Sequence, residues 1–103
     1  MLLSYGFSES QLVSIYNLLK VIQETNTAIS SNSKIDGVEY FMDKYKNFYV
    51  SYCLSDYSEG GLQTNLIYTS INPFGEVINL NSIYNNSEDI VKKLEKCQKI
   101  SLA

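Results

Sequence analysis

The clearest pattern in the chain is a run of apolar residues at helical spacing near its start. Ser8 and Gln11 stand at the positions of a capping box, in which each side chain bonds the backbone N–H of the other. Phe7 and Leu12 hold the two positions of a hydrophobic staple around it. The stripe that follows recurs every three or four residues, and its members are Leu12, Ile15, Tyr16, Leu19 and Ile22. These features predict a helix over residues 9–25.

The middle of the chain alternates between apolar and polar residues, as β-strands do. Residues 48–54 predict a strand, and Ser58-Glu59-Gly60-Gly61 predicts the turn that leads into a return strand over residues 62–71. The buried face of that return strand stays open, because Leu62, Leu66 and Tyr68 compete with Ile67 and Ile71 for it. A second turn at Asn72-Pro73-Phe74-Gly75 precedes a strand over residues 76–80.

Residues 38–45 fit two patterns. Val38, Tyr40 and Met42 alternate as in a strand, whereas Ile35, Val38, Phe41, Met42 and Tyr45 also share one helical face. The preceding Gly37 and the high aromatic content favour a strand.

The end of the chain predicts a second helix over residues 88–99, capped by Ser87. Its apolar stripe consists of Ile90, Val91, Leu94 and Cys97. The fold class that follows is α+β: a two-layer sandwich with an N-terminal helix, a three- or four-stranded antiparallel sheet and a C-terminal helix. Both helices are expected to cover the same sheet face, and residues 1–103 to form a single globular domain.

The amino-acid composition argues against several classes of function. The chain of 103 residues has no histidine, and all eight of its cationic residues are lysines. Neither the usual general base nor the usual zinc ligand is present, so we expect no catalytic residues, no metal and no cofactor. A net charge of −3 without any arginine argues against nucleic-acid binding. Cys53 and Cys97 are expected to be reduced thiols. Without a signal peptide or a long apolar run, the protein is expected to be cytoplasmic and to have no contact with a membrane.

Charge and tyrosine gather in the predicted sheet. Residues 35–76 hold six acidic residues against two lysines, and they also hold six of the nine tyrosines. If Val38, Phe48 and Val50 face the helices, the period of two sends the side chains between them to the opposite face. The candidate partner-binding residues on that face and in the adjoining turn are Glu39, Asp43, Tyr45, Tyr49, Asp56, Tyr57 and Glu59.

An acidic surface with tyrosine anchors suits a basic protein partner. The sequence therefore favours a small binding module that inhibits or neutralises such a partner, in the manner of an immunity protein or antitoxin acting on a nuclease toxin. Nucleases carry basic active sites because they grip phosphate. The alternative is a structural or regulatory subunit that forms a homodimer through the sheet.

Overall fold

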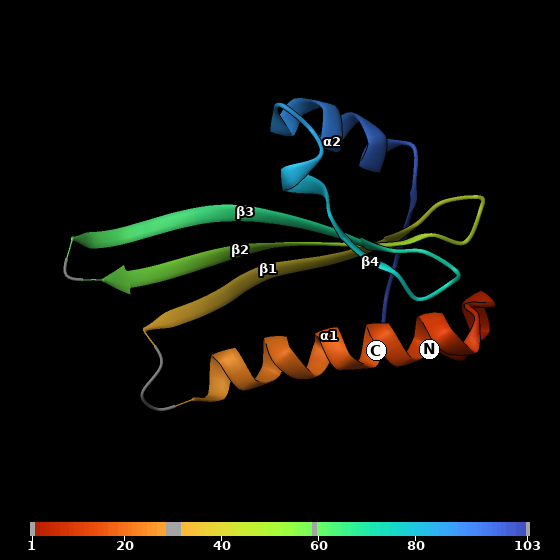
Figure 1. The fold of residues 1–103 in the computed structure, drawn as a ribbon, viewed down its shortest axis with the longest axis horizontal. Coiled ribbons are helices and arrows are strands. Elements are labelled where there is room, and N and C mark those ends of the chain that lie inside the picture. The colour runs from red at the N-terminus through yellow and green to blue at the C-terminus, as the bar shows by residue number, and fades with distance from the viewer. Residues whose placement is uncertain (1, 29–31, 59, 103) are drawn as a thin grey trace.

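The computed structural model describes residues 2–28, 32–58 and 60–102, and these form two helical layers around one sheet (Figure 1). In chain order the elements are a 3₁₀ turn η1 (Leu2–Tyr5), α1 (Glu9–Thr27), β1 (Ser33–Met42), β2 (Phe48–Ser58), β3 (Gly61–Ile71), β4 (Val77–Asn79), a 3₁₀ turn η2 (Leu80–Ser82), α2 (Ser87–Glu95) and β5 (Gln98–Ile100). The described sheet has five strands in the order β4-β3-β2-β1-β5, and every neighbouring pair is antiparallel. The α+β class is confirmed, with more strands than the three or four expected.

Helix α1 begins where its capping signals place it. The Gln11 backbone N–H donates to Ser8 Oγ at 3.1 Å, and the Ser8 N–H donates to Gln11 Oε1 at 3.2 Å. The helix then continues to Thr27, two residues beyond the predicted end. Gln11 also has a tertiary role, because its side chain is fully buried. Its Nε2 donates to the carbonyls of Lys46 and Ile71, at 2.6 and 2.9 Å, and so ties the helix to the β1–β2 turn and to the end of β3.

The main core lies between α1 and the sheet face that it follows along its whole length (Figure 1). Phe48 and Val50 of β2 and Ile71 of β3 are buried there against Ile15 of the helix. Val38, Tyr40 and Tyr52 pack around them, so the predicted facing of β1 and β2 is confirmed. On β3, Ile67 and Ile71 are the residues that face α1, because Ile67 pairs with Tyr52 and Ile71 pairs with Phe48.

A β-bulge explains the two patterns of residues 38–45. The segment is a strand up to Met42, but the register with β2 shifts between Asp36 and Glu39. Gly37 takes a φ of +61° inside this shift. The extra residue lets Ile35 and Val38 share the α1 face although they are three positions apart, which is the spacing that imitates a helix.

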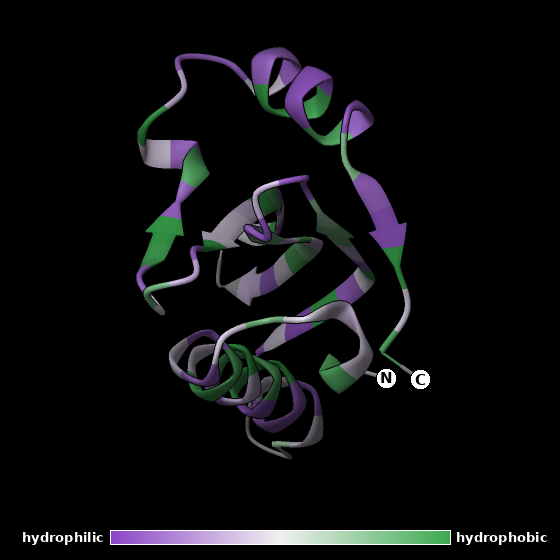
Figure 2. Cartoon of the chain, turned by 90° about the vertical axis from the view of Figure 1, so that its right-hand side faces the viewer, coloured by the Kyte–Doolittle hydropathy of each residue, from purple (hydrophilic) through white to green (hydrophobic). Residues whose placement is uncertain are grey.

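The two helices do not share a sheet face, which corrects the two-layer prediction. Figure 1 shows α1 on one side of the sheet and α2 on the other. The physical reason is that the strands are apolar on both faces: Tyr49 and Tyr68 are buried opposite the main core, against Ile90 and Leu94 of α2. Figure 2 shows the same division in α2, whose sheet-facing side is hydrophobic and whose outer side is hydrophilic.

The C-terminal prediction is wrong in its cap and in its length. Asn86, not Ser87, caps α2, because its Oδ1 accepts from the Asp89 N–H at 3.1 Å. The helix ends at Glu95, and Gln98 and Lys99, which were expected to be helical, form β5 together with Ile100. Ile100 pairs with Tyr40 at the edge of β1 and is buried in the main core. Pairing with the edge of β1 therefore outweighs the helical pattern of the residues that form β5.

Candidate functional site

The structure describes six of the seven predicted partner-binding residues and distributes them over three places. Asp43 and Tyr45 lie in the β1–β2 turn, with Tyr49 shortly after it. Glu39 lies midway along β1. Asp56 and Tyr57 lie near the opposite end of β2, roughly 25 Å from Tyr49 at the usual rise per strand residue. Glu59 lies outside the described residues. The predicted set therefore does not form one compact site.

Asp43 organises the β1–β2 turn. Its Oδ1 accepts from the N–H groups of Tyr45 and Asn47, at 2.8 and 3.0 Å. Its Oδ2 accepts from Asn47 Nδ2 at 2.9 Å and from the Tyr49 hydroxyl at 2.8 Å. Burial alone would raise the pKa of Asp43, but the hydrogen bonds from Asn47, Tyr49 and Tyr45 outweigh it and lower the pKa. This carboxylate already accepts four hydrogen bonds within its own turn.

Tyr49 is an interior residue with only 3% of its surface exposed. Helix α2 covers its ring, and the Lys93 ammonium lies 5.8 Å from the ring centroid. Burial, and then the hydrogen bond to Asp43, raise the pKa of Tyr49 well above its usual value. Any influence of Tyr49 on a partner therefore passes through the turn and α2 and not through direct contact.

The hollow beside this turn carries mainly positive charge. It is lined by Asp43, Lys44, Tyr45, Tyr49, Lys93, Lys96 and Cys97, which sets three ammonium groups against one carboxylate. Lys44 also lies 5.1 Å from the centroid of the exposed Tyr45 ring. Burial and the nearby Asp43 carboxylate raise the pKa of the Cys97 thiol, so the thiol stays protonated at neutral pH. The hollow suits a basic partner poorly.

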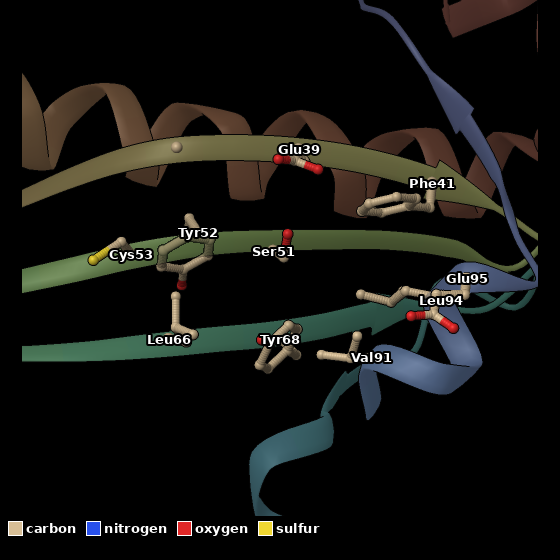
Figure 3. A pocket seen from close by; sticks show the side chains of 11 residues that line it. Glu39, Phe41, Ser51, Tyr52, Cys53, Leu66, Tyr68, Val91, Leu94 and Glu95 are labelled. Carbon is tan, nitrogen blue, oxygen red and sulfur yellow. The ribbon is translucent and has the colours of Figure 1, made fainter. Parts of the chain in front are cut away.

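A second depression, the groove, lies on the α2 face of the sheet beside that helix (Figure 3). It has a volume of about 400 Å³ and draws residues from β1, β2, β3 and α2. Its lining consists of Gly37, Glu39, Phe41, Ser51, Tyr52, Cys53, Leu66, Tyr68, Val91, Leu94 and Glu95. The Tyr52 side chain packs towards the main core on the opposite face; most of the other side chains are apolar or aromatic, and none of them is cationic. The groove therefore combines an apolar floor with two carboxylates, those of Glu39 and Glu95.

The groove exists because α2 is shorter than the strands beneath it. Helix α2 spans nine residues, whereas β2 and β3 span eleven each, and both strands continue beyond it in Figure 1. On this uncovered part, Leu66 pairs with Cys53 and Leu62 with Tyr57. Leu62 and Leu66 are 58% and 55% exposed, and Tyr57 is also exposed. An apolar strip thus runs from the groove towards the tip of the β2–β3 hairpin.

One ion pair modifies the charge of the groove. Lys99 Nζ of β5 lies 3.5 Å from Glu39 Oε2, with both side chains largely exposed. Exposed pairs of this kind are weak and exchange readily with other partners. Glu95 has no ion pair among the described residues, so it is the more accessible of the two carboxylates.

Sequence reasoning found Glu39 and Tyr57 of this face but missed the groove itself. Leu66 and Tyr68 were recognised only as one of two alternative faces of their strand, and Glu95 only as part of a helix. The available signal was that both faces of the predicted sheet carry apolar residues, which requires cover on both sides.

Other kinds of site have little support in the described ranges. No group of three or more His, Cys, Asp or Glu side chains gathers closely enough there to hold a metal ion. None of the helices in these ranges is both long and apolar enough to cross a membrane. Cys53 and Cys97 are both free thiols, as predicted.

Comparison with known proteins adds no relative. No protein-family model matches the chain, and no curated protein or solved structure is significantly similar to it. The functional assignment therefore rests on the chemistry of the groove.

Proposed function

We propose that this protein is a binding module that docks a basic protein in the groove and inhibits or neutralises that partner. The observation that carries the proposal is the pairing of an uncovered apolar floor with two carboxylates and no lining cation. Lysine and arginine side chains have the complementary form, an apolar stem that ends in a positive group. Phe41, Val91 and Leu94 provide contacts for the stem, and Glu39 and Glu95 provide partners for the charge.

The apolar strip beyond the groove adds contact area. Tyr57 and Leu62 lie on the same sheet face as the groove, where a partner that follows the strands would cover them. Tyrosine is enriched among the residues that dominate binding energy, because it buries a large ring at little cost in conformational entropy. Tyr57 is therefore the aromatic anchor of this proposal, and Glu39 is the predicted acidic residue that lies at the groove.

We infer the neutralising role from the charge of proteins that bind nucleic acid. A protein that grips phosphate, such as a nuclease, concentrates lysine and arginine at its active site. A module that engages those side chains would cover the same surface and prevent nucleic acid from binding. We therefore place the protein with immunity proteins and antitoxins in its mode of action.

The test begins with affinity capture from cells that produce the protein, at low salt, followed by mass spectrometry. Two variants make a matched pair. Glu95→Lys reverses a charge at the C-terminal end of α2 beside the groove, and Glu24→Lys makes the same change near the C-terminal end of α1, on the other side of the sheet. A lysine suits the helix dipole at both positions, so neither change should disturb folding.

We expect a basic partner that is retained by the wild type and by Glu24→Lys and is lost with Glu95→Lys. Retention should weaken as salt rises, because the contacts of the carboxylates are exposed to solvent. If the purified partner is an enzyme, adding this protein should lower its activity. Equal capture by both variants, or capture that salt does not change, would contradict the groove as the binding site.

A further inference from the structure

The outer edge of β3 is only partly covered. Strand β4 pairs with Thr69–Ile71 and no further. Beyond it, the side chain of Asn81 continues the pattern: its Nδ2 donates to the Leu66 carbonyl at 2.8 Å, and its Oδ1 accepts from the Tyr68 N–H at 2.7 Å. Within the described residues, no strand pairs with this edge from Leu62 to Asn65.

The backbone groups on this edge point away from the sheet. Leu66 and Tyr68 bond to Asn81 on the outer side of β3, while β2 occupies the inner side. Outward and inward residues alternate in an antiparallel pair, so the N–H and C=O groups of Leu62 and Thr64 also point outward. These groups are a template for another strand.

The sequence of β3 has none of the usual protections of a strand edge. Its eleven residues include no charged residue and no proline. Proteins commonly place lysine, proline or inward-pointing charges on exposed edges to prevent pairing. Leu62 and Leu66, both exposed, flank Thr64 on the groove side of the strand.

The other edge of the sheet, along β1, is met by a strand at one end and by a side-chain amide at the other. Strand β5 covers the end of β1 from Tyr40 to Met42. The amide of Asn26 then closes the edge at Ile35: its Oδ1 accepts from the Ile35 N–H at 2.7 Å, and its Nδ2 donates to the Ile35 carbonyl at 2.9 Å. Lys34 and Asp36 put charges on either side of that point. The contrast singles out β3 as the edge that is open to pairing.

We propose that a second copy of this chain pairs with this edge, so that the two β3 strands run antiparallel about a two-fold axis near Gln63. The edge is self-complementary, because an antiparallel two-fold brings the same outward groups of each copy together. Two copies of a chain with net charge −3 repel each other. Strand β3 contains no charged residue, so pairing along it adds no charge repulsion at the contact. Leu62 of each copy would pair with Thr64 of the other, so the pairing stays within the free part of the edge and buries exposed apolar surface of Leu62.

The geometry predicts a closed dimer and not a growing fibril. Pairing uses the β3 edge of both copies. The β1 edge is covered by β5 at Tyr40–Met42 and closed by Asn26 at Ile35, and the bulge at Gly37 interrupts the stretch between them. Asn81 sets the limit of the overlap, since it already occupies the edge at Leu66 and Tyr68. The inference does not rest on the proposed function, because it uses the backbone of β3 and not the carboxylates of the groove.

The experiment is sedimentation velocity of the purified protein over a wide concentration range, with two substitutions at one position. Thr64→Pro removes the outward N–H, and an edge strand tolerates proline where its N–H faces solvent. Thr64→Ala keeps the N–H and is the matched control. We expect a reversible dimer for the wild type and for Thr64→Ala, and a dimer weakened by about tenfold or more for Thr64→Pro. Raising the salt concentration should not weaken the dimer.

Two further measurements keep the result decisive. Circular dichroism and urea denaturation establish that each variant is folded. Thr64→Lys, at an exposed position, places like charges on both sides of the axis and should also weaken the dimer without unfolding the monomer. A wild type that stays monomeric at all concentrations overturns the proposal. So does a dimer that Thr64→Pro and Thr64→Lys leave unchanged, or an assembly that grows without limit.

Discussion

Gln11 offers the sharpest test of how this fold is held together. It is a fully buried polar side chain that bonds three backbone groups, one in each of three segments. We predict that Gln11→Leu, which preserves the approximate size and removes the polar atoms, will strongly destabilise the protein. The substitution leaves the carbonyls of Lys46 and Ile71 without their donor inside the protein.

The magnitude follows from the groups left unpaired. A buried carbonyl that loses its donor costs about 1–3 kcal/mol; the bond to Ile71 is buried, and the bond to Lys46 is partly buried and costs less. Loss of the reciprocal cap at Ser8 adds about 0.5–1 kcal/mol. The extra apolar surface of leucine returns about 1–2 kcal/mol. With each contribution at the middle of its range, the free energy of unfolding should fall by about 2–3 kcal/mol.

The assay is urea denaturation followed by circular dichroism, with Gln23→Leu as the control. Gln23 lies on the same helix but is exposed, so its substitution should change the free energy of unfolding by less than about 0.5 kcal/mol. If Gln11→Leu is also within about 0.5 kcal/mol of the wild type, the bonds of Gln11 do not tie α1 to the β1–β2 turn and the end of β3, and the reasoning fails.

Three further predictions test the core, a turn and the β1–β2 connection. Val50→Ala should lower the free energy of unfolding by about 2–3 kcal/mol because Val50 is 1% exposed, and a loss under about 0.5 kcal/mol would contradict its place in the core. Gly75→Ala should cost about 2 kcal/mol or more in thermal denaturation, since φ is +83° and the new Cβ would lie 2.7 Å from the Ser10 carbonyl oxygen; Gly37→Ala, with open space around it, should cost only about 1 kcal/mol, and equal losses would refute the contact. The lowered pKa of Asp43 means that its carboxylate stabilises the fold above its unfolded pKa of about 3.9 and loses this effect as the pH falls through the folded value. The wild type should therefore be more stable than Asp43→Asn at neutral pH, and the difference between their urea midpoints should shrink at about pH 2.5. A difference of the same size at both pH values would argue against that role of the carboxylate.

The sequence alone could predict the elements whose causes are local. The start of α1 is decided by Ser8 and Gln11, which lie within one helical turn of each other, so its capping box needs no tertiary contact. The hairpin of β2 and β3 is likewise specified by two alternating stretches and a glycine turn, and the α1 face of β2 follows from alternation at Phe48 and Val50. Such signals are complete in a short window, and here they gave the right type of element.

Other features depend on contacts between distant segments, and these the pattern could not supply. Residues 98–100 became β5 because the edge of β1 was free to accept Ile100, which no local rule reveals. The bulge at Gly37 made a strand imitate helical spacing. The two helices took opposite faces because Tyr49 and Tyr68 needed cover that α1 could not provide.

The candidate site shows the same division. Alternation alone placed Glu39 on the face opposite the main core, because the side chains of a strand can point in only two directions. Tyr57 was expected in the adjoining turn, whereas β2 continues through it to Ser58. Alternation could not show that Tyr49 is covered and Leu66 is not, since that depends on where α2 ends above the sheet. Nor could it show that Asp43 is engaged within its own turn or that Glu95 stands at a groove. Alternation within β1 and β2 indicates which side chains share a face, and the length and position of α2 decide which of them a partner can reach.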